Sequence, residues 1–218
     1  MIIHYGKQWD ILFNPTKSQL ITFGGPNPTA CEIHINDKVI PWVGKIKYLG
    51  LYFLCNTGLT DITDSTRKFY GKFNNIVFTL GNGSCEITAL HLTTTIYCLP
   101  SLLYGCEVWH LTDTNMDKIS VAWNNCFRRI FSCCWRESVK PLQYFCSSLP
   151  IPHIIQQRKL LFWKKIYWSD NIVLLTLSRL TYNAFIVVGC TFGVLTPKLS
   201  DNAVKGLVWN SFTASLEL

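Results

Sequence analysis

Lys45-Ile-Lys-Tyr-Leu-Gly-Leu-Tyr-Phe53 is the stretch that decides the fold of the N-terminal part of this chain. Its aromatic and branched residues suit a pleated, half-buried surface, and Gly50 stands where a strand must bend. The stretch predicts a β-hairpin with Tyr48-Leu49-Gly50 at its tip, and Lys45 and Lys47 alternate outward beside it. An apolar tip between two ammonium groups would suit the end of a nucleic-acid strand. The alternative is a strand of a mixed sheet whose lysines are only solvated.

The segments around this hairpin also favour β-structure. Residues 9–13 and 20–23 are short apolar runs, and Asn14-Pro15 between them is a turn initiator because a residue before proline avoids the helical region. Residues 31–40 alternate in polarity around Asn36-Asp37, which predicts a second hairpin. So small a sheet requires a hydrophobic partner layer.

After Asn56 the hydrophobic period becomes helical. The expected helices run from Asp61 or Asp64 to Leu80, from Glu86 to a break near Leu99-Pro100, from Thr112 or Asp113 onward, from Ser138 and Pro141 to Leu149-Pro150, and onward from Pro152. The third helix carries an apolar stripe of Met116, Ile119, Trp123, Phe127, Ile130 and Cys134. In the fifth helix we expect Ile154, Ile155, Leu161 and Phe162 to pack, and Gln156, Lys159, Lys164 and Lys165 to reach solvent.

The predicted fold class is α+β, a small N-terminal antiparallel β-hairpin layer followed by a helical bundle. We expect a β domain over residues 1–56, a helical domain over residues 57–170, and an apolar C-terminal tail over residues 171–218 that carries no assignable motif.

Positive charge is concentrated in one window of the 218 residues. Between residues 118 and 168 there are nine Lys and Arg against one acid, Glu137, so this window carries +8 and the rest of the chain −1 of the formal +7. Such a concentration suits a phosphate backbone. The alternative is a solvated face on a slightly basic protein.

The ten cysteines do not predict disulfides or zinc. No Cys-x-x-Cys occurs, and Cys133-Cys134 with the distant Cys146 and His153 is not a zinc-finger spacing. The N-terminus has no secretory pattern. We therefore expect most cysteines to be small core residues, no bound metal, and a location in the cytoplasm or nucleus.

Two uncharged stretches have the length of a membrane span. Residues 87–106 contain a histidine, three consecutive threonines and a proline, while residues 180–197 are more apolar but interrupted by Asn183, Gly189 and Gly193. A buried helix or strand is the favoured interpretation. A small membrane protein anchored through 180–197 is the alternative.

Five motifs in order carry a family resemblance over about residues 5–170. They are Trp9-Asp-Ile-Leu-Phe-Asn-Pro-Thr-Lys-Ser18, Lys47-Tyr-Leu-Gly50, Leu103-Tyr-Gly-Cys-Glu-Val-Trp109, Phe127-Arg-Arg-Ile-Phe131 and Leu149-Pro-Ile151 followed by a basic helix. Together they resemble the downstream part of a non-LTR retrotransposon reverse transcriptase of the LINE or jockey type.

The resemblance implies a role for each region. Lys17 would assist the departing pyrophosphate, Tyr48-Leu49-Gly50 would grip the primer end, and residues 61–168 would form the thumb along an RNA/DNA duplex. The nucleic-acid contacts expected from the hairpin and the basic window are Lys45, Lys47, Tyr48, Leu49, Gly50, Arg128, Arg129, Arg158, Lys159, Lys164 and Lys165.

The chain departs from the family in its acidic residues. Polymerases hold two metal ions, Mg²⁺ in this family, through carboxylates, whereas no Asp-Asp pair occurs here and Asp61 and Asp64 suit helix capping. We expect a piece cut after the catalytic turn, with no cofactor of its own and no polymerase activity alone. A part that acts in trans with a separate palm domain is the alternative.

Overall fold

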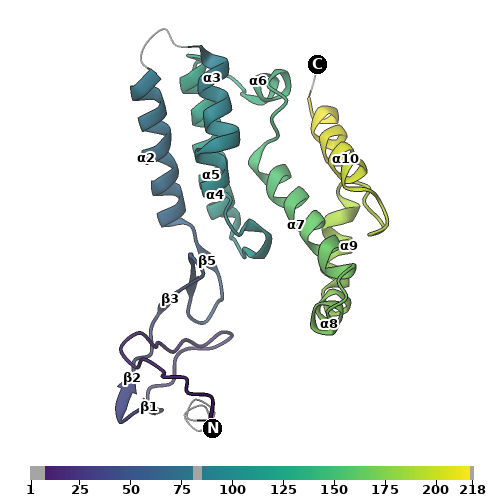
Figure 1. Cartoon of the computed structure of the whole chain (residues 1–218). Coiled ribbons are helices and arrows are strands. Elements are labelled where there is room, and N and C mark those ends of the chain that lie inside the picture. The colour runs from purple at the N-terminus through teal and green to yellow at the C-terminus, as the bar shows by residue number, and fades with distance from the viewer. Residues whose placement is uncertain (1–7, 81–84, 217–218) are drawn as a thin grey trace. The chain divides into compact units, whose positions relative to one another are not determined.

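The computed structural model describes residues 8–80 and 85–216. These residues form two compact units. The β-unit comprises residues 8–62 and 110–112, and the helical unit comprises residues 63–80, 85–109 and 113–216. The predicted α+β class is confirmed, because strands occupy the first unit and helices the second (Figure 1).

The β-unit contains two small antiparallel sheets, and both predicted hairpins are present. Strands β1 (Ile33–Ile35) and β2 (Lys38–Ile40) form one sheet; β3 (Lys45–Tyr48), β4 (Leu51–Leu54) and β5 (Thr60–Asp61) form the other. In the first hairpin Asn36 and Asp37 have φ of 49° and 59°. Left-handed conformations at both turn residues match the right-handed twist of the strands, and Asn and Asp tolerate them well.

Two predicted strands are wrong. Residues 9–13 have no strand, and residues 20–23 contribute only single bridges, Leu20 to Trp42 and Phe23 to Asn56. A strand needs both a ladder partner and a surface to cover. Leu12 is 91% exposed, so this apolar run has no surface on which to pack.

Helices make up the second unit. They are α2 (Thr63–Leu80), α3 (Glu86–His91), the π-helical turn η1 (Leu92–Ile96), α4 (Cys98–Leu102), the 3₁₀ turn η2 (Cys106–Val108), α5 (Asp113–Ile130), α6 (Lys140–Phe145), α7 (Ile151–Tyr167), α8 (Ile172–Leu180), α9 (Tyr182–Cys190) and α10 (Asp201–Ala214). The predicted starts at Glu86 and Asp113 are confirmed. The predicted break also exists but precedes Pro100, between Ile96 and Cys98, because the proline ring would clash with the carbonyl four residues before it.

Helices α2, α4 and α5 lie side by side around an aromatic core (Figure 1). Phe69 and Phe73 of α2 and Trp123 and Phe127 of α5 are almost fully buried. Each such ring stabilises the folded state by about 1.5–3 kcal/mol. The predicted place of Cys134 on the α5 stripe is wrong, because the helix ends at Ile130 and Cys134 is exposed.

Helix α7 packs through part of the predicted set, since Ile155 is buried and Leu161 packs against the core as predicted. Its buried residues are Ile151, Ile155, Leu160 and Trp163, whereas Phe162 is 39% exposed. The predicted packing of Phe162 is therefore wrong. Two aromatic residues in succession cannot both face the core of a helix with 3.6 residues per turn, and Trp163 takes the buried position.

The chain beyond residue 170 packs on α7. Trp163 stacks on Phe185 of α9 with ring centroids 4.2 Å apart, and Val204 and Val208 of α10 join the same core. A Cβ at Gly189 would overlap the carbonyl oxygen of Val194, so only glycine permits this close approach of helix and loop.

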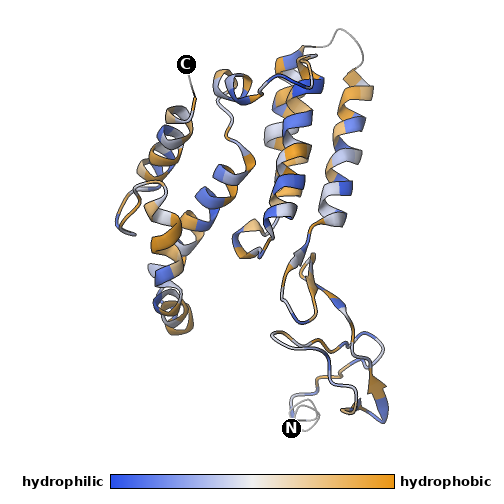
Figure 2. Cartoon of the chain, turned by 180° about the vertical axis from the view of Figure 1, so that it is seen from behind, coloured by the Kyte–Doolittle hydropathy of each residue, from blue (hydrophilic) through white to orange (hydrophobic). Residues whose placement is uncertain are grey.

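Apolar side chains remain exposed on α8. Ile172, Val173 and Leu180 are at least 62% exposed, and Figure 2 colours this helix and α9 mostly as hydrophobic. Among the described residues no single helix is long and apolar enough to span a membrane. Helices α8 and α9 together have the length and composition of a span, but they are bent by 56° relative to each other.

The prediction that most cysteines are core residues is wrong. Only Cys98, Cys106 and Cys126 are buried, and the other seven are partly or fully exposed. All ten are free thiols. Burial raises the pKa of Cys98 to about 11 and that of Cys106 to about 12, because it penalises the thiolate.

Candidate nucleic-acid interface

The predicted β3–β4 hairpin is present, and its turn consists of Leu49-Gly50, because Tyr48 of the predicted tip belongs to strand β3. Tyr48 pairs with Leu51 across it, and Leu49 and Gly50 have φ of 46° and 86°. Gly50 adopts this conformation freely, but in a bulky residue such as Leu49 it is uncommon and strained. Leu49 is 73% exposed and Tyr48 64% exposed. The tip therefore presents two large side chains to solvent, and one of them, Leu49, has a strained backbone. Strained backbone conformations cluster at functional sites.

The two lysines of the hairpin share one face with Tyr52. Lys45 and Lys47 lie 4.4 and 5.4 Å from the centroid of this ring, within cation–π range. Lys45 also forms an ion pair with Asp61 of β5. Lys47 forms no ion pair within the described residues. Lys47 is therefore the hairpin cation that is open to an anionic partner.

The Asn14-Pro15 turn places Lys17 at the surface. The Asn14 carboxamide oxygen accepts hydrogen bonds from the Thr16 amide at 3.0 Å and from its hydroxyl at 2.7 Å, and the Lys17 amide donates to the Asn14 carbonyl at 3.2 Å. This is the local bonding that makes Asn a turn former. Lys17 is exposed, and its role in catalysis stays a prediction.

Arg158 and Lys159 of α7 hold the segment Leu103–Trp109. An Arg158 guanidinium nitrogen lies 3.4 Å from the Leu103 carbonyl and 3.9 Å from a Glu107 carboxylate oxygen. The Lys159 ammonium donates to the Trp109 carbonyl at 2.9 Å. The predicted solvent-facing position of Lys159 is wrong: it falls four residues after Ile155 and four before Trp163, on the buried stripe, and burial lowers its pKa.

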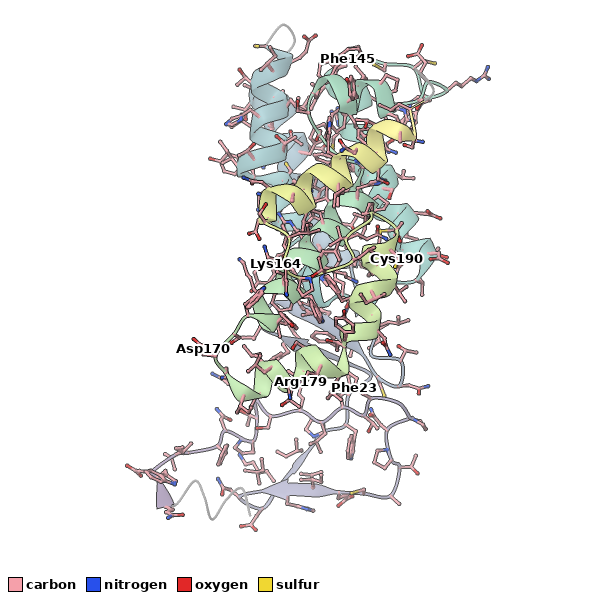
Figure 3. The ribbon with its side chains drawn as sticks, turned by 90° about the vertical axis from the view of Figure 1, so that its right-hand side faces the viewer. Phe23, Phe145, Lys164, Asp170, Arg179 and Cys190 are labelled. Atoms are coloured by element: carbon pink, nitrogen blue, oxygen red, sulfur yellow. The ribbon has the colours of Figure 1, made fainter. Side chains whose placement is uncertain are left out.

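Lys164 and Lys165 differ although they are neighbours. Lys164, which is labelled in Figure 3, pairs with Asp201 at the start of α10. Only 17% of the Lys164 side chain is exposed. Its ammonium lowers the pKa of the Asp201 carboxyl. Lys164 does not reach solvent as predicted, whereas Lys165 is exposed and has no ion pair among the described residues.

Arg128 and Arg129 lie in the last turn of α5, where cations are favourable for the helix dipole. The helix ends in a Schellman motif: Ser132 has φ of 52°, and the Cys133 amide donates to the Arg128 carbonyl at 2.9 Å. The chain consequently turns back, and Trp135 lies 5.6 Å from the Arg128 guanidinium carbon.

Trp135 and Asn74 are neighbours of these arginines that were not predicted from the sequence. The Arg129 guanidinium donates to the Asn74 carboxamide oxygen at 2.7 Å across 55 residues of sequence. Trp135 is 72% exposed. A tryptophan shortly after an arginine-rich helix end was the one signal in the sequence for an aromatic neighbour of these arginines. No local pattern pointed to Asn74.

Three of the cations that remain after ion pairing, Arg128, Arg129 and Arg136, lie at or just after the end of α5. In the basic window Arg158 and Lys164 are ion-paired and Lys159 is bound internally. Six others have no ion pair within the described residues: Lys118, Arg128, Arg129, Arg136, Lys140 and Lys165. All are exposed except Arg128, which is half-buried and donates to the Glu137 carbonyl at 3.2 Å. We call this set the open cations. Residues 8–80 and 85–216 contain no cluster of His, Cys, Asp and Glu that could hold a metal ion.

Comparison with known proteins relates this chain to transposon reverse transcriptases at a distant level. The relative found is described as a probable RNA-directed DNA polymerase from the transposon X-element of Drosophila melanogaster, and it is 28% identical over 136 residues. The match covers 60% of this chain and 15% of the relative. No family model matches the chain, and no solved structure does.

Proposed function

We propose that this chain is the late-palm and thumb part of a non-LTR retrotransposon reverse transcriptase and binds duplex nucleic acid without sequence preference. The observation that carries the proposal is the set of six open cations on the helical unit. Cations that no carboxylate neutralises remain available to phosphates. The relationship to an RNA-directed DNA polymerase supports an RNA/DNA duplex as the partner.

Salt dependence of binding tests this proposal. Each neutralised phosphate of duplex DNA contributes a slope of about −0.9 to log affinity against log salt, so six contacts give about −5 as the limit. We expect a slope between about −2 and −5 by fluorescence anisotropy with duplexes of unrelated sequence. Absence of binding at low salt, or a flat response, would overturn the proposal.

We also propose that the hairpin tip contacts the primer end through Lys47 and Tyr48-Leu49-Gly50. The exposed, strained turn supports this role. Nucleotide addition requires metal-binding carboxylates, which a separate palm domain would supply. Primer extension should therefore fail with this chain alone. Extension by the purified chain without an added palm would contradict this part of the proposal.

A further inference from the structure

A cavity of about 330 Å³ opens between α2, the end of α5 and the loop that follows α5. This is within the range of small-molecule sites, roughly 300–1,000 Å³. Tyr70 and Asn74 line it from α2, Asn125, Arg128 and Arg129 from α5, and Trp135 from the loop. No carboxylate is among its lining residues. The cavity thus combines aromatic surface with two positive charges.

The polar wall of this cavity consists of hydrogen-bond donors. Arg129 donates to the side-chain oxygen of Asn74 at 2.7 Å, and Arg128 donates to that of Asn125 at 3.3 Å. Because a guanidinium can only donate, both amide oxygens are fixed toward the arginines. Neither amide NH₂ group has a partner within the described residues. The Arg128 Nε also lacks an acceptor, but it is buried and does not face the open cavity. Such a wall suits a ligand rich in acceptor oxygens.

Trp135 supplies the surface for an aromatic ligand. Its ring is 72% exposed, and the Arg128 guanidinium lies 5.6 Å from it. A base stacked on an aromatic side chain in single-strand sites contributes enough to change affinity by about tenfold or more. Phosphate oxygens and base carbonyls are the acceptors that the amide and guanidinium donors require.

We propose that this cavity binds one nucleotide of a single-stranded segment, with its base on Trp135 and its phosphate on Arg129. The inference rests on the proposed function and adds to it a stacking site that shares Arg128 and Arg129 with the open cations. Duplex binding uses the phosphate backbone, which the open cations contact, whereas the cavity requires an unpaired base that can stack.

The test compares two probes by fluorescence anisotropy with the full chain. One is a blunt 16-base-pair duplex, and the other is the same duplex with a four-thymidine overhang. We expect the overhang to tighten binding by about tenfold. Trp135→Leu should abolish this preference while leaving the blunt-duplex affinity and its salt slope unchanged. Trp168→Leu is the matched control, because Trp168 is 59% exposed and does not line the cavity, and it should retain the preference.

The outcomes separate the two proposals. Blunt-duplex binding without any overhang preference would refute the nucleotide site and leave the proposed function standing. Absence of binding to either probe by the wild-type chain would refute both the proposed function and the nucleotide site. Equal competition against the overhang probe by a phosphotyrosine peptide would also refute the nucleotide site, because it would show that the cavity recognises an aromatic phosphate on a protein. Circular dichroism spectra of each variant would establish that it is folded.

Discussion

Removing one lysine at a time from α7 tests whether ion pairing and burial decide which cations meet phosphate. Lys165 is exposed and unpaired within the described residues, whereas the Lys159 ammonium is half-buried and bound to the Trp109 carbonyl. Methionine keeps most of the aliphatic stem of either side chain and removes its charge. Lys165→Met and Lys159→Met therefore form a matched pair.

Lys165→Met should change the salt dependence of binding, whereas Lys159→Met should change the stability of the fold. If Lys165 contacts one phosphate, its loss makes the salt slope less negative by about 0.9, which corresponds to about a 3.5-fold change in affinity ratio between 50 and 200 mM salt. Lys159→Met should leave the slope unchanged. It should instead lower the free energy of unfolding by about 1–2 kcal/mol, because a charged hydrogen bond of about 1.5–3 kcal/mol is lost and the relief of desolvation offsets part of it.

Anisotropy titrations at four salt concentrations and urea unfolding followed by circular dichroism measure the two effects. The reasoning would be refuted if Lys159→Met made the salt slope less negative by as much as Lys165→Met does. An ammonium bound inside the protein would then be contacting nucleic acid. No change in slope for either variant would show that α7 lies outside the interface.

Three further predictions concern the turn, the close packing and the thiols. Leu49→Asn should stabilise the chain by up to about 1 kcal/mol in urea unfolding, because Asn tolerates positive φ, and it should weaken binding to a recessed primer end; unchanged primer binding would remove Leu49 from the interface. Gly189→Ala should lower stability by about 1–3 kcal/mol through overpacking, whereas Gly206→Ala in α10, with open space around it, should be neutral or stabilising by up to about 1 kcal/mol; equal effects would contradict the close approach. Cys85 is exposed and its pKa is lowered by hydrogen bonds from the backbone, so iodoacetamide should modify it at neutral pH well before Cys106, and peptide mapping showing the reverse order would contradict the assignment of their burial.

Elements with a strong local signal were predictable from the sequence. The hairpin turn at Leu49-Gly50 follows from the glycine and its alternating flanks, and α2 follows from Phe69, Phe73 and Ile76 at helical spacing. The absence of a strand over residues 9–13, where one was predicted, does not follow from the local sequence. Strand formation depends on a partner ladder and a covering layer, which a local pattern does not encode.

The candidate site was predictable only in outline. The sequence identifies Arg128 and Lys159 as equal positive charges, but their surroundings depend on which residues the fold brings beside them. Lys159 meets the Trp109 carbonyl from 50 residues away, and Arg128 is covered by a tryptophan that a Schellman turn folds back. Charge counting therefore treats as equivalent cations whose surroundings differ, because it does not see which residues the fold brings beside them.

The small core of the β-unit explains why it should be poorly soluble. Ile40, Leu51 and Ile62 are buried, whereas Leu12 and Val39 are 91% and 53% exposed. Exposed apolar side chains, both on short strands and beside them, invite association with other chains. We therefore expect a low soluble fraction on expression, and we expect Leu12→Lys with Val39→Thr to raise it without lowering the melting temperature, because neither side chain is buried. A wild-type chain that is monodisperse by light scattering at high concentration would contradict this expectation. A gain in solubility would support association of chains through this apolar surface.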